Sequence, residues 1–332
     1  MPKLPLTVLT HRVFPETLAM LSGRTEVLTN DTLGTLPPDE VLARCREADA
    51  MMAFMPDTVD AAFLASCPKL KIVACALKGY DNFDVEACTR RNVWVTVVDD
   101  LLTVPTAELA VGLTISLARH VRAGDADIRA GKFTAWRPTL YGTGLAGRTV
   151  GIVGMGKVGR AIAKRLSGFD AELMYTDRQQ LDPVTAASLH VVHSGFEELM
   201  SRADFVVLAA PLTADTQEIV DARAIGMMKP GAYLVNPARG SLVDESVVAE
   251  ALAEERLGGY AADVFAFEDW ARADRPRAIP ETLLAQTEKT LFTPHLGSAV
   301  VEVRKAIEAE AATSILEALQ GDRPTGAINE LG

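Results

Sequence analysis

The sequence has few of the features that mark a nucleic-acid-binding, membrane-spanning or secreted protein. Its 332 residues carry a formal net charge of −11, and no apolar run approaches the roughly 20 residues that a membrane helix needs. An acidic surface repels nucleic acid and anionic lipid, so we expect neither as a partner. The N-terminus shows no basic segment followed by a sustained apolar stretch, so we expect no secretory signal and a cytoplasmic location.

Cysteine is also scarce. The four cysteines, which show no C-x-x-C spacing, are Cys45, Cys67, Cys75 and Cys88. In a cytoplasmic protein such cysteines are expected to be reduced and buried, without a metal or disulfide role. The composition is otherwise ordinary, with 48% apolar and 23% charged residues, and the chain is long enough for two α/β domains.

What the sequence does contain is a glycine-rich turn near its middle. The run GMGKVG at residues 154–159 directly follows the apolar stretch Thr149–Val153, and Asp177 ends the next apolar stretch. This spacing is the dinucleotide-binding fingerprint, in which glycines permit a tight turn and the acid binds the adenosine ribose. A strand-turn-helix connection without a ligand is the alternative, and the acid at the next strand end counts against it.

We therefore expect NAD as the cofactor, with its pyrophosphate at the start of the helix that follows the turn. The turn residues expected to contact it are Gly154, Gly156, Lys157, Val158 and Gly159.

Two neighbouring residues govern the choice between NAD and NADP. Asp177 can accept hydrogen bonds from the ribose 2′-hydroxyl and would repel a 2′-phosphate, which favours NAD. Arg178 could instead pair with that phosphate. We therefore expect NAD to be preferred and NADP to be tolerated.

Short apolar runs alternate with helical patterns along the chain, which predicts parallel βα units. Strands are expected near residues 6–10, 26–29, 50–55, 71–77, 93–98, 149–153, 172–176, 205–210, 232–236, 260–264 and 290–293. We interpret the fold as α/β, with two doubly wound parallel-sheet lobes and a cleft between them. A flavodoxin-like substrate domain would comprise residues 1–102 and 299–332, and a Rossmann NAD-binding domain residues 103–298. One long helix from Thr106 to about Arg129 would join the lobes.

Ligands of open parallel sheets bind beyond the carboxyl ends of the strands, and three chemically complementary side chains follow strands of the second lobe. His295 is suited to accept a proton near neutral pH, and Glu268 to orient and stabilise its ring. Arg239 offers a planar fork of donors for a substrate oxyanion. Together with a nicotinamide cofactor these groups predict a dehydrogenase. A structural Glu–His pair and a surface arginine are the alternative.

Other strand ends and turns supply further candidates. Additional cofactor contacts are expected from Thr106, Pro211, Pro237, Ala238, Asp263 and His295 itself. In the first lobe, Met55 and the pair Lys78-Gly79 follow strands. The remaining histidines, expected to be solvent-facing or structural, are His11, His120, His190 and His193.

The second lobe resembles the D-2-hydroxyacid dehydrogenase superfamily, whose members carry the same Arg, Glu and His. Over longer stretches the chain resembles the phosphite dehydrogenases, also called phosphonate dehydrogenases, of that superfamily. The similar segments are MMAFMPD (51–57), CALKGYDNFD (75–84), DLLTVPTAEL (100–109), GGYAADVF (258–265) and EDWARADRP (268–276). Hydroxyacid enzymes usually follow the catalytic Glu with proline, whereas this chain has Asp269-Trp270. Ala266 and the pair Asp177-Arg178 depart from the phosphite dehydrogenase pattern.

The resemblance implies oxidation of phosphite to phosphate, with hydride transfer to the nicotinamide C4 and water activated by His295 and Glu268. It implies a homodimer formed through the long helix. The substrate-binding residues that it implies are Met55, Lys78, Gly79, Arg239 and Arg304.

Two other functions remain open. A D-2-hydroxyacid dehydrogenase, such as a glyoxylate or hydroxypyruvate reductase, needs the same base, anion-binding arginine and cofactor. A non-catalytic NAD-sensing scaffold, similar to corepressors of this fold, is a second alternative. The complete set of Arg239, Glu268 and His295 counts against the scaffold.

Overall fold

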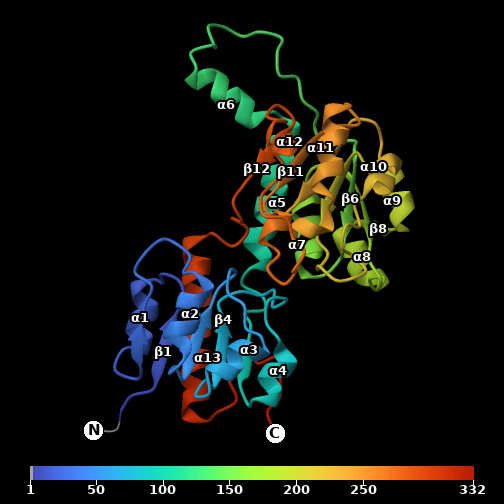
Figure 1. The fold of residues 1–332 in the computed structure, drawn as a ribbon. Coiled ribbons are helices and arrows are strands. Elements are labelled where there is room, and N and C mark those ends of the chain that lie inside the picture. The colour runs from blue at the N-terminus through green and yellow to red at the C-terminus, as the bar shows by residue number, and fades with distance from the viewer. Residues whose placement is uncertain (1–2) are drawn as a thin grey trace. The chain divides into compact units, whose positions relative to one another are not determined.

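A computed structural model describes residues 3–332, which form two compact units (Figure 1). The first unit contains the described residues up to Leu102 together with Trp270–Ala273 and Ala299–Gly332. The second contains Thr103–Asp269 and Asp274–Ser298. The predicted pair of parallel-sheet α/β folds is confirmed.

The first unit is built on a five-stranded parallel sheet with the order β2-β1-β3-β4-β5, the flavodoxin-like order. Its strands are β1 (Leu6–Leu9), β2 (Glu26–Leu28), β3 (Ala50–Ala53), β4 (Ile72–Cys75) and β5 (Trp94–Thr96). Its helices are α1 (Pro15–Leu21), α2 (Pro38–Cys45), α3 (Ala61–Ser66), α4 (Val85–Arg90) and α13 (Val301–Gln320).

Both faces of this sheet are buried, which explains why its strands read as continuous apolar runs. Met51 and Val73 pack on the face that is covered by α2, α3 and α4. Met52 and Ala74 point to the other face, where α1 and the late helix α13 cover them (Figure 1). The C-terminal helix is therefore part of the core of the first unit.

The edge strand β5 is covered by the C-terminal tail. Ile328 donates its backbone N–H to Val95, and Val97 donates to Gly326. The buried Asn329 side chain accepts from the N–H of Val95 at 2.9 Å and donates to the carbonyl of Val93 at 2.9 Å. The tail thus satisfies backbone groups that an edge strand would otherwise leave unpaired.

The second unit contains a seven-stranded parallel sheet with the order β12-β11-β10-β9-β6-β7-β8, an extended Rossmann order. Its strands are β6 (Thr149–Val153), β7 (Glu172–Thr176), β8 (Val191–His193), β9 (Phe205–Leu208), β10 (Ala232–Asn236), β11 (Leu257–Ala262) and β12 (Thr290–Phe292). Its helices are α5 (Thr103–Ala118), α6 (Val121–Arg129), α7 (Lys157–Leu166), α8 (Pro183–Leu189), α9 (Phe196–Arg202), α10 (Ala222–Met227), α11 (Glu245–Ala253) and α12 (Glu281–Leu284), with 3₁₀ turns η1 (Gly240–Leu242) and η2 (Ala266–Glu268).

The two faces of this sheet carry separate cores. Leu113 of α5 and Ile162 of α7 pack with Val150 and Ile152 on one face. Helices α9, α10 and α11 cover the other face. The sequence order reverses between β6 and β9, so the carboxyl end of β6, which bears the glycine turn, lies at the position where such sheets bind ligands.

Two details differ from the predictions. The prediction of a single long helix was wrong. Helix α5 starts at Thr103 and ends at Ala118, and α6 follows after His120. The φ of His120 is +52°, which breaks the helix. The strand β8 was missed because its three residues, Val191–His193, form a short edge strand that gives almost no alternating pattern.

Replacing Asn329 by alanine is expected to destabilise the first unit. The change leaves the N–H of Val95 and the carbonyl of Val93 without their side-chain partner, at a cost of roughly 1–3 kcal/mol. Urea unfolding followed by circular dichroism measures it. Arg323→Ala, which removes an exposed ion pair with Glu330, is the control and should leave the free energy of unfolding nearly unchanged. Equal effects of the two variants would contradict the role of Asn329.

Candidate active site

The glycine turn at the end of β6 has the geometry that a dinucleotide requires. Gly154 has a φ of +97°, and a Cβ there would lie 2.7 Å from the carbonyl carbon of Ala209. A Cβ on Gly159 would lie 2.1 Å from the carbonyl oxygen of Gly154. A Cβ on Gly156 would meet nothing within 4 Å, so this position faces open space at the start of α7. The first and third glycines allow tight packing, and the second leaves room for a phosphate group at a helix N-terminus.

Asp177 stands beside this turn, as predicted. Its Oδ2 accepts the backbone N–H of Met155 at 2.6 Å, and its Oδ1 accepts that of Gln179 at 3.2 Å. Asp177 is partly exposed and Arg178 is exposed. The acid therefore fixes the turn while staying accessible, and the residues present fit a nicotinamide dinucleotide.

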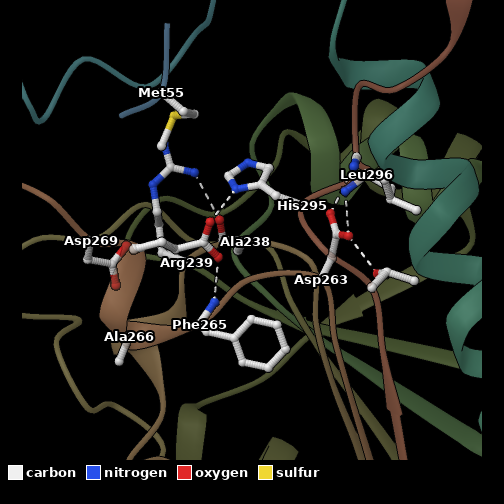
Figure 2. Close-up of polar contacts among 12 residues, drawn as sticks. Met55, Ala238, Arg239, Asp263, Phe265, Ala266, Asp269, His295 and Leu296 are labelled. Carbon is white, nitrogen blue, oxygen red and sulfur yellow. Dashed lines mark hydrogen bonds and ion pairs between the residues drawn. The ribbon is translucent and has the colours of Figure 1, made fainter. Parts of the chain in front are cut away.

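His295 and Glu268 form a hydrogen-bonded pair (Figure 2). The ring Nδ1 of His295 lies 2.8 Å from Oε2 of Glu268. The other carboxylate oxygen of Glu268 accepts the N–H of Phe265 at 2.6 Å, which fixes the orientation of the carboxylate. A carboxylate at Nδ1 favours the tautomer with the proton on Nδ1 and leaves Nε2 as the basic nitrogen. The predicted Glu–His pair is therefore formed within the second unit.

The loop that carries His295 is held by the buried carboxylate of Asp263, which is 1% exposed. Its Oδ1 accepts the N–H of Leu296 at 2.7 Å and the Thr293 hydroxyl at 2.6 Å, and its Oδ2 accepts the N–H of Gly297 at 2.8 Å (Figure 2). Burial is the main cause that raises the pKa of Asp263. The structure thus gives Asp263 a role in shaping this loop, and its contact with the cofactor stays a prediction.

Arg239 follows β10 in a loop that a buried asparagine fixes. Asn236 accepts the N–H of Ala238 at 3.1 Å and donates to the carbonyl of Arg239 at 2.8 Å. The guanidinium of Arg239 donates to the carbonyl of Ala238 at 2.9 Å, and the side chain is half-buried. In Figure 2 the guanidinium of Arg239 and the ring of His295 both lie above Phe265 and Ala266.

Gly240, the residue after Arg239, brings the Arg239 loop against the turn that carries Glu268. A Cβ on Gly240 would lie 1.8 Å from the carbonyl carbon of Phe265 and 2.1 Å from the nitrogen of Ala266. Only glycine permits this approach, so η1 and η2 pack backbone against backbone. The predicted trio of Arg239, Glu268 and His295 is therefore gathered at one end of the second sheet.

Sequence reasoning missed Glu245, the first residue of α11. Its Oε1 accepts the N–H of Ala266 at 2.8 Å, and the side chain is 5% exposed. Burial raises the pKa of Glu245 to about 7, and the nearby carboxylates of Asp269, Glu268 and Asp244 add to the effect. In the sequence it follows the helix-capping Asp244 and looks like an ordinary acid in a first helical turn.

The candidates of the first unit lie at the carboxyl edge of its sheet. Met55 follows β3, and Lys78 follows β4 with its Nζ 3.3 Å from Oδ1 of Asp99. Arg304, in the first turn of α13, donates to the carbonyl of Ala76 at 3.3 Å and stacks over the Phe54 ring at 5.7 Å. Two cations are thereby placed at the ligand-binding edge of this sheet.

His11 lies at the same edge, which the sequence did not reveal. It follows β1, its ring centroid is 5.1 Å from that of Phe54, and its Nδ1 is 3.2 Å from the Thr10 hydroxyl. Burial, and then the charge of Arg304, lower the pKa of His11. The strand-end rule that selected Lys78 would also have selected His11.

Three other features concern metal sites, membrane spans and cysteines in the described part of the chain. Residues 3–332 contain no group of three or more His, Cys, Asp or Glu side chains that could hold a metal ion. Within the same residues no helix is long and apolar enough to cross a membrane. The four cysteines are buried and unpaired with one another.

Comparison with known proteins places this geometry in context. Residues 111–297 match the NAD-binding domain of the D-isomer-specific 2-hydroxyacid dehydrogenases. A glyoxylate reductase of Pyrococcus furiosus is 34% identical over 325 residues, 96% of this chain and 94% of the relative. A D-3-phosphoglycerate dehydrogenase of Mycobacterium tuberculosis is 35% identical over 98% of this chain and 59% of the relative. A solved structure of a Thermus thermophilus protein superposes with a TM-score of 0.88 at 33% identity, covering 98% of this chain and 100% of that one.

Replacing Glu245 by glutamine is expected to flatten the dependence of stability on pH. The folded-state pKa of Glu245 is about 7, against 4.5 when unperturbed, so the folded state holds the proton more tightly. Tighter proton binding by Glu245 stabilises the folded state. This stabilisation is complete below the unperturbed pKa of 4.5 and is lost as pH rises through about 7. E245Q should therefore gain stability relative to the wild type as the pH of urea unfolding rises across this window. The exposed Glu250→Gln on the same helix is the control. Parallel pH profiles for wild type and E245Q would contradict the buried, protonated state.

Proposed function

Because the chain belongs to the D-isomer-specific 2-hydroxyacid dehydrogenase family, we propose that it oxidises phosphite to phosphate with NAD. The family assignment confirms the superfamily resemblance and the prediction of an NAD-binding dehydrogenase. The relatives described above are named glyoxylate reductase and phosphoglycerate dehydrogenase rather than phosphite dehydrogenase. The choice of phosphite therefore depends on features of this chain.

The observation that carries the proposal is the presence of two cations, Lys78 and Arg304, at the ligand-binding edge of the first sheet. The second unit adds a third, Arg239. Phosphite is a small, largely dianionic oxyanion at neutral pH, whereas a 2-hydroxyacid of similar size carries one carboxylate charge. Several preorganised cations suit the dianion, and more so as charge builds on its oxygens during attack. The local resemblance of residues 75–84 and 268–276 to phosphite dehydrogenases supports the same substrate.

The residues of this chain divide the chemistry among them. Arg239 and Lys78 bind the phosphite oxygens, with Arg304 as a further cation, while Met55 and Gly79 line the substrate. His295 takes a proton from the attacking water at Nε2, and Glu268 stabilises the imidazolium that forms. The new P–O bond forms as the P–H bond breaks, and the hydride leaves with its electron pair. Bound NAD would accept that hydride at the nicotinamide C4.

The cofactor is held by the glycine turn, and Asp177 sets its type. The carboxylate, already fixed to the N–H of Met155, would accept the ribose hydroxyl and repel a 2′-phosphate. Arg178, exposed next to it, would allow weaker use of NADP. The other proposed contacts are Thr106, Pro211, Pro237, Ala238 and Asp263.

We propose a homodimer because of two properties of α6 and the loop after it. These segments extend away from the rest of the second unit (Figure 1), and they expose apolar side chains. None of the α6 residues is buried. Ile128, Phe133, Trp136 and Tyr141 expose more than half of their surface. Exposed apolar side chains gathered in one segment mark a protein interface.

A second candidate is a reductase of glyoxylate or hydroxypyruvate, and the names of the relatives favour it. In that reaction His295 would exchange its proton with the substrate hydroxyl or carbonyl oxygen instead of water. About one-third identity shows the family but leaves the substrate open, so both candidates are tested together.

The test is to follow the absorbance of the reduced cofactor with each substrate. Phosphite, glycolate, D-lactate and D-glycerate are offered with NAD or NADP, and glyoxylate and hydroxypyruvate with the reduced cofactors. We expect phosphite with NAD to give the highest kcat/KM, and His295→Ala to lower kcat by roughly 10²-fold or more. His193→Asn, on the edge strand β8, is the matched control. Turnover of glyoxylate without any phosphite oxidation would refute the proposal in favour of the second candidate.

Replacing Lys78 by alanine is expected to raise the KM for phosphite. A charged hydrogen bond to the dianion contributes about 1.5–3 kcal/mol, which corresponds to a rise of about 10- to 100-fold. Lys71→Ala is the control, because Lys71 directly precedes β4 at the opposite edge of the same sheet and pairs with Asp49. An unchanged KM in K78A would remove Lys78 from the substrate site.

A further inference from the structure

Asp269 is a buried carboxylate that the proposed chemistry does not use. It directly follows Glu268 at the end of η2 and is only 2% exposed. Its Oδ2 accepts the backbone N–H of Ser241 at 2.7 Å. Ser241 lies in η1, two residues after Arg239, and is completely buried. This hydrogen bond therefore joins the segment of the anion-binding arginine to the segment of the Glu–His pair.

The bond lies at the point where the two segments touch. The Gly240 backbone packs directly on that of Phe265 and Ala266, as the short distances from a Cβ at Gly240 show. Packing alone prevents the segments from approaching further but does not prevent them from separating. A charged hydrogen bond in a buried setting supplies the attraction.

Arg239 is consequently held from both sides. Before it, Asn236 binds the N–H of Ala238 and the carbonyl of Arg239 itself. After it, Asp269 binds the N–H of Ser241. On the partner segment, Glu268 is fixed by the N–H of Phe265 and in turn orients His295.

We infer that Asp269 is a positioning residue, which holds the guanidinium of Arg239 in register with His295 and Glu268 through its hydrogen bond to Ser241. The inference deepens the proposed function, because the register matters for a tetrahedral anion that must meet the guanidinium and the general base at once. A displacement of about 1 Å in such a site is enough to lower the rate by about 10²-fold.

The first test compares Asp269→Ala with Asp269→Asn. D269A leaves the N–H of Ser241 without its acceptor, and the KM for phosphite should rise by about tenfold or more. D269N retains an acceptor oxygen and should recover most of that loss. The KM for NAD and the pH dependence of kcat should stay as in the wild type in both variants, because the glycine turn and the Glu268–His295 pair are intact.

Asp204→Ala is the matched control. Asp204 also accepts a backbone N–H, that of Thr149 at 2.9 Å, but at the amino edge of the same sheet. Its loss should lower the melting temperature to a similar extent and leave the KM for phosphite unchanged. A purely structural role for Asp269 would make D269A and D204A alike.

The second test asks whether Asp269 acts through Arg239. Arg239→Gln is combined with Asp269→Ala, or with Asp269→Ser if D269A does not fold, because both changes remove the carboxylate that binds the N–H of Ser241. The double variant should have nearly the same KM for phosphite as R239Q alone, because the positioning of an absent guanidinium has no effect. Additive losses, or a wild-type KM in both folded Asp269 variants, would overturn the inference. Absence of phosphite oxidation in the wild type would instead refute the proposed function.

Discussion

The hydrogen bond between Glu268 and His295 is the interaction on which the proposed chemistry of the second unit depends. At 2.8 Å it favours the tautomer with the proton on Nδ1, which leaves Nε2 as the basic atom. The bond is useful only if both partners are held, and both are. Glu268 is fixed by the N–H of Phe265, and the loop of His295 is fixed by Asp263. Neither anchor touches the ring of His295, yet both determine where that ring lies.

Carboxylates that accept backbone N–H groups recur throughout this region. Asp177, Glu245, Asp263, Glu268 and Asp269 each do so. The loops after parallel strands have backbone donors that no neighbouring strand pairs, and an acidic side chain satisfies them with a strong, short bond. Several of these acids are buried, so they remain tolerable only while their donors are in place. The acidic composition of the chain thus contributes to the rigidity of its loops as well as to its surface.

Much of the architecture could be predicted from the sequence because it follows from burial. Strands such as β3 and β4 are covered on both faces and must be apolar throughout. The glycine turn was recognisable because Gly154 and Gly159 have no room for a side chain. Arg239, Glu268 and His295 were found because parallel strands bring their carboxyl ends to one edge.

Other features could not be predicted, for equally physical reasons. Glu245 looks like an ordinary surface acid in the sequence, and the bond from Ser241 to Asp269 could not be foreseen, since burial among distant segments has no local pattern. The break at His120 comes from one residue with positive φ that no glycine or proline marks. His11 follows a strand like Lys78, but its partners Phe54 and Arg304 come from residues far along the chain.

The position of α13 in the core of the first unit has a consequence for biosynthesis. Met52 and Ala74 lie under a helix that begins at Val301, so their face of the sheet stays partly uncovered until residues 301–320 have left the ribosome. The second unit, whose residues are all translated before Ala299, can close while the first is still open. Nascent chains therefore carry an incompletely protected apolar face while the whole second unit is being made, and chaperone binding would shield it until α13 arrives.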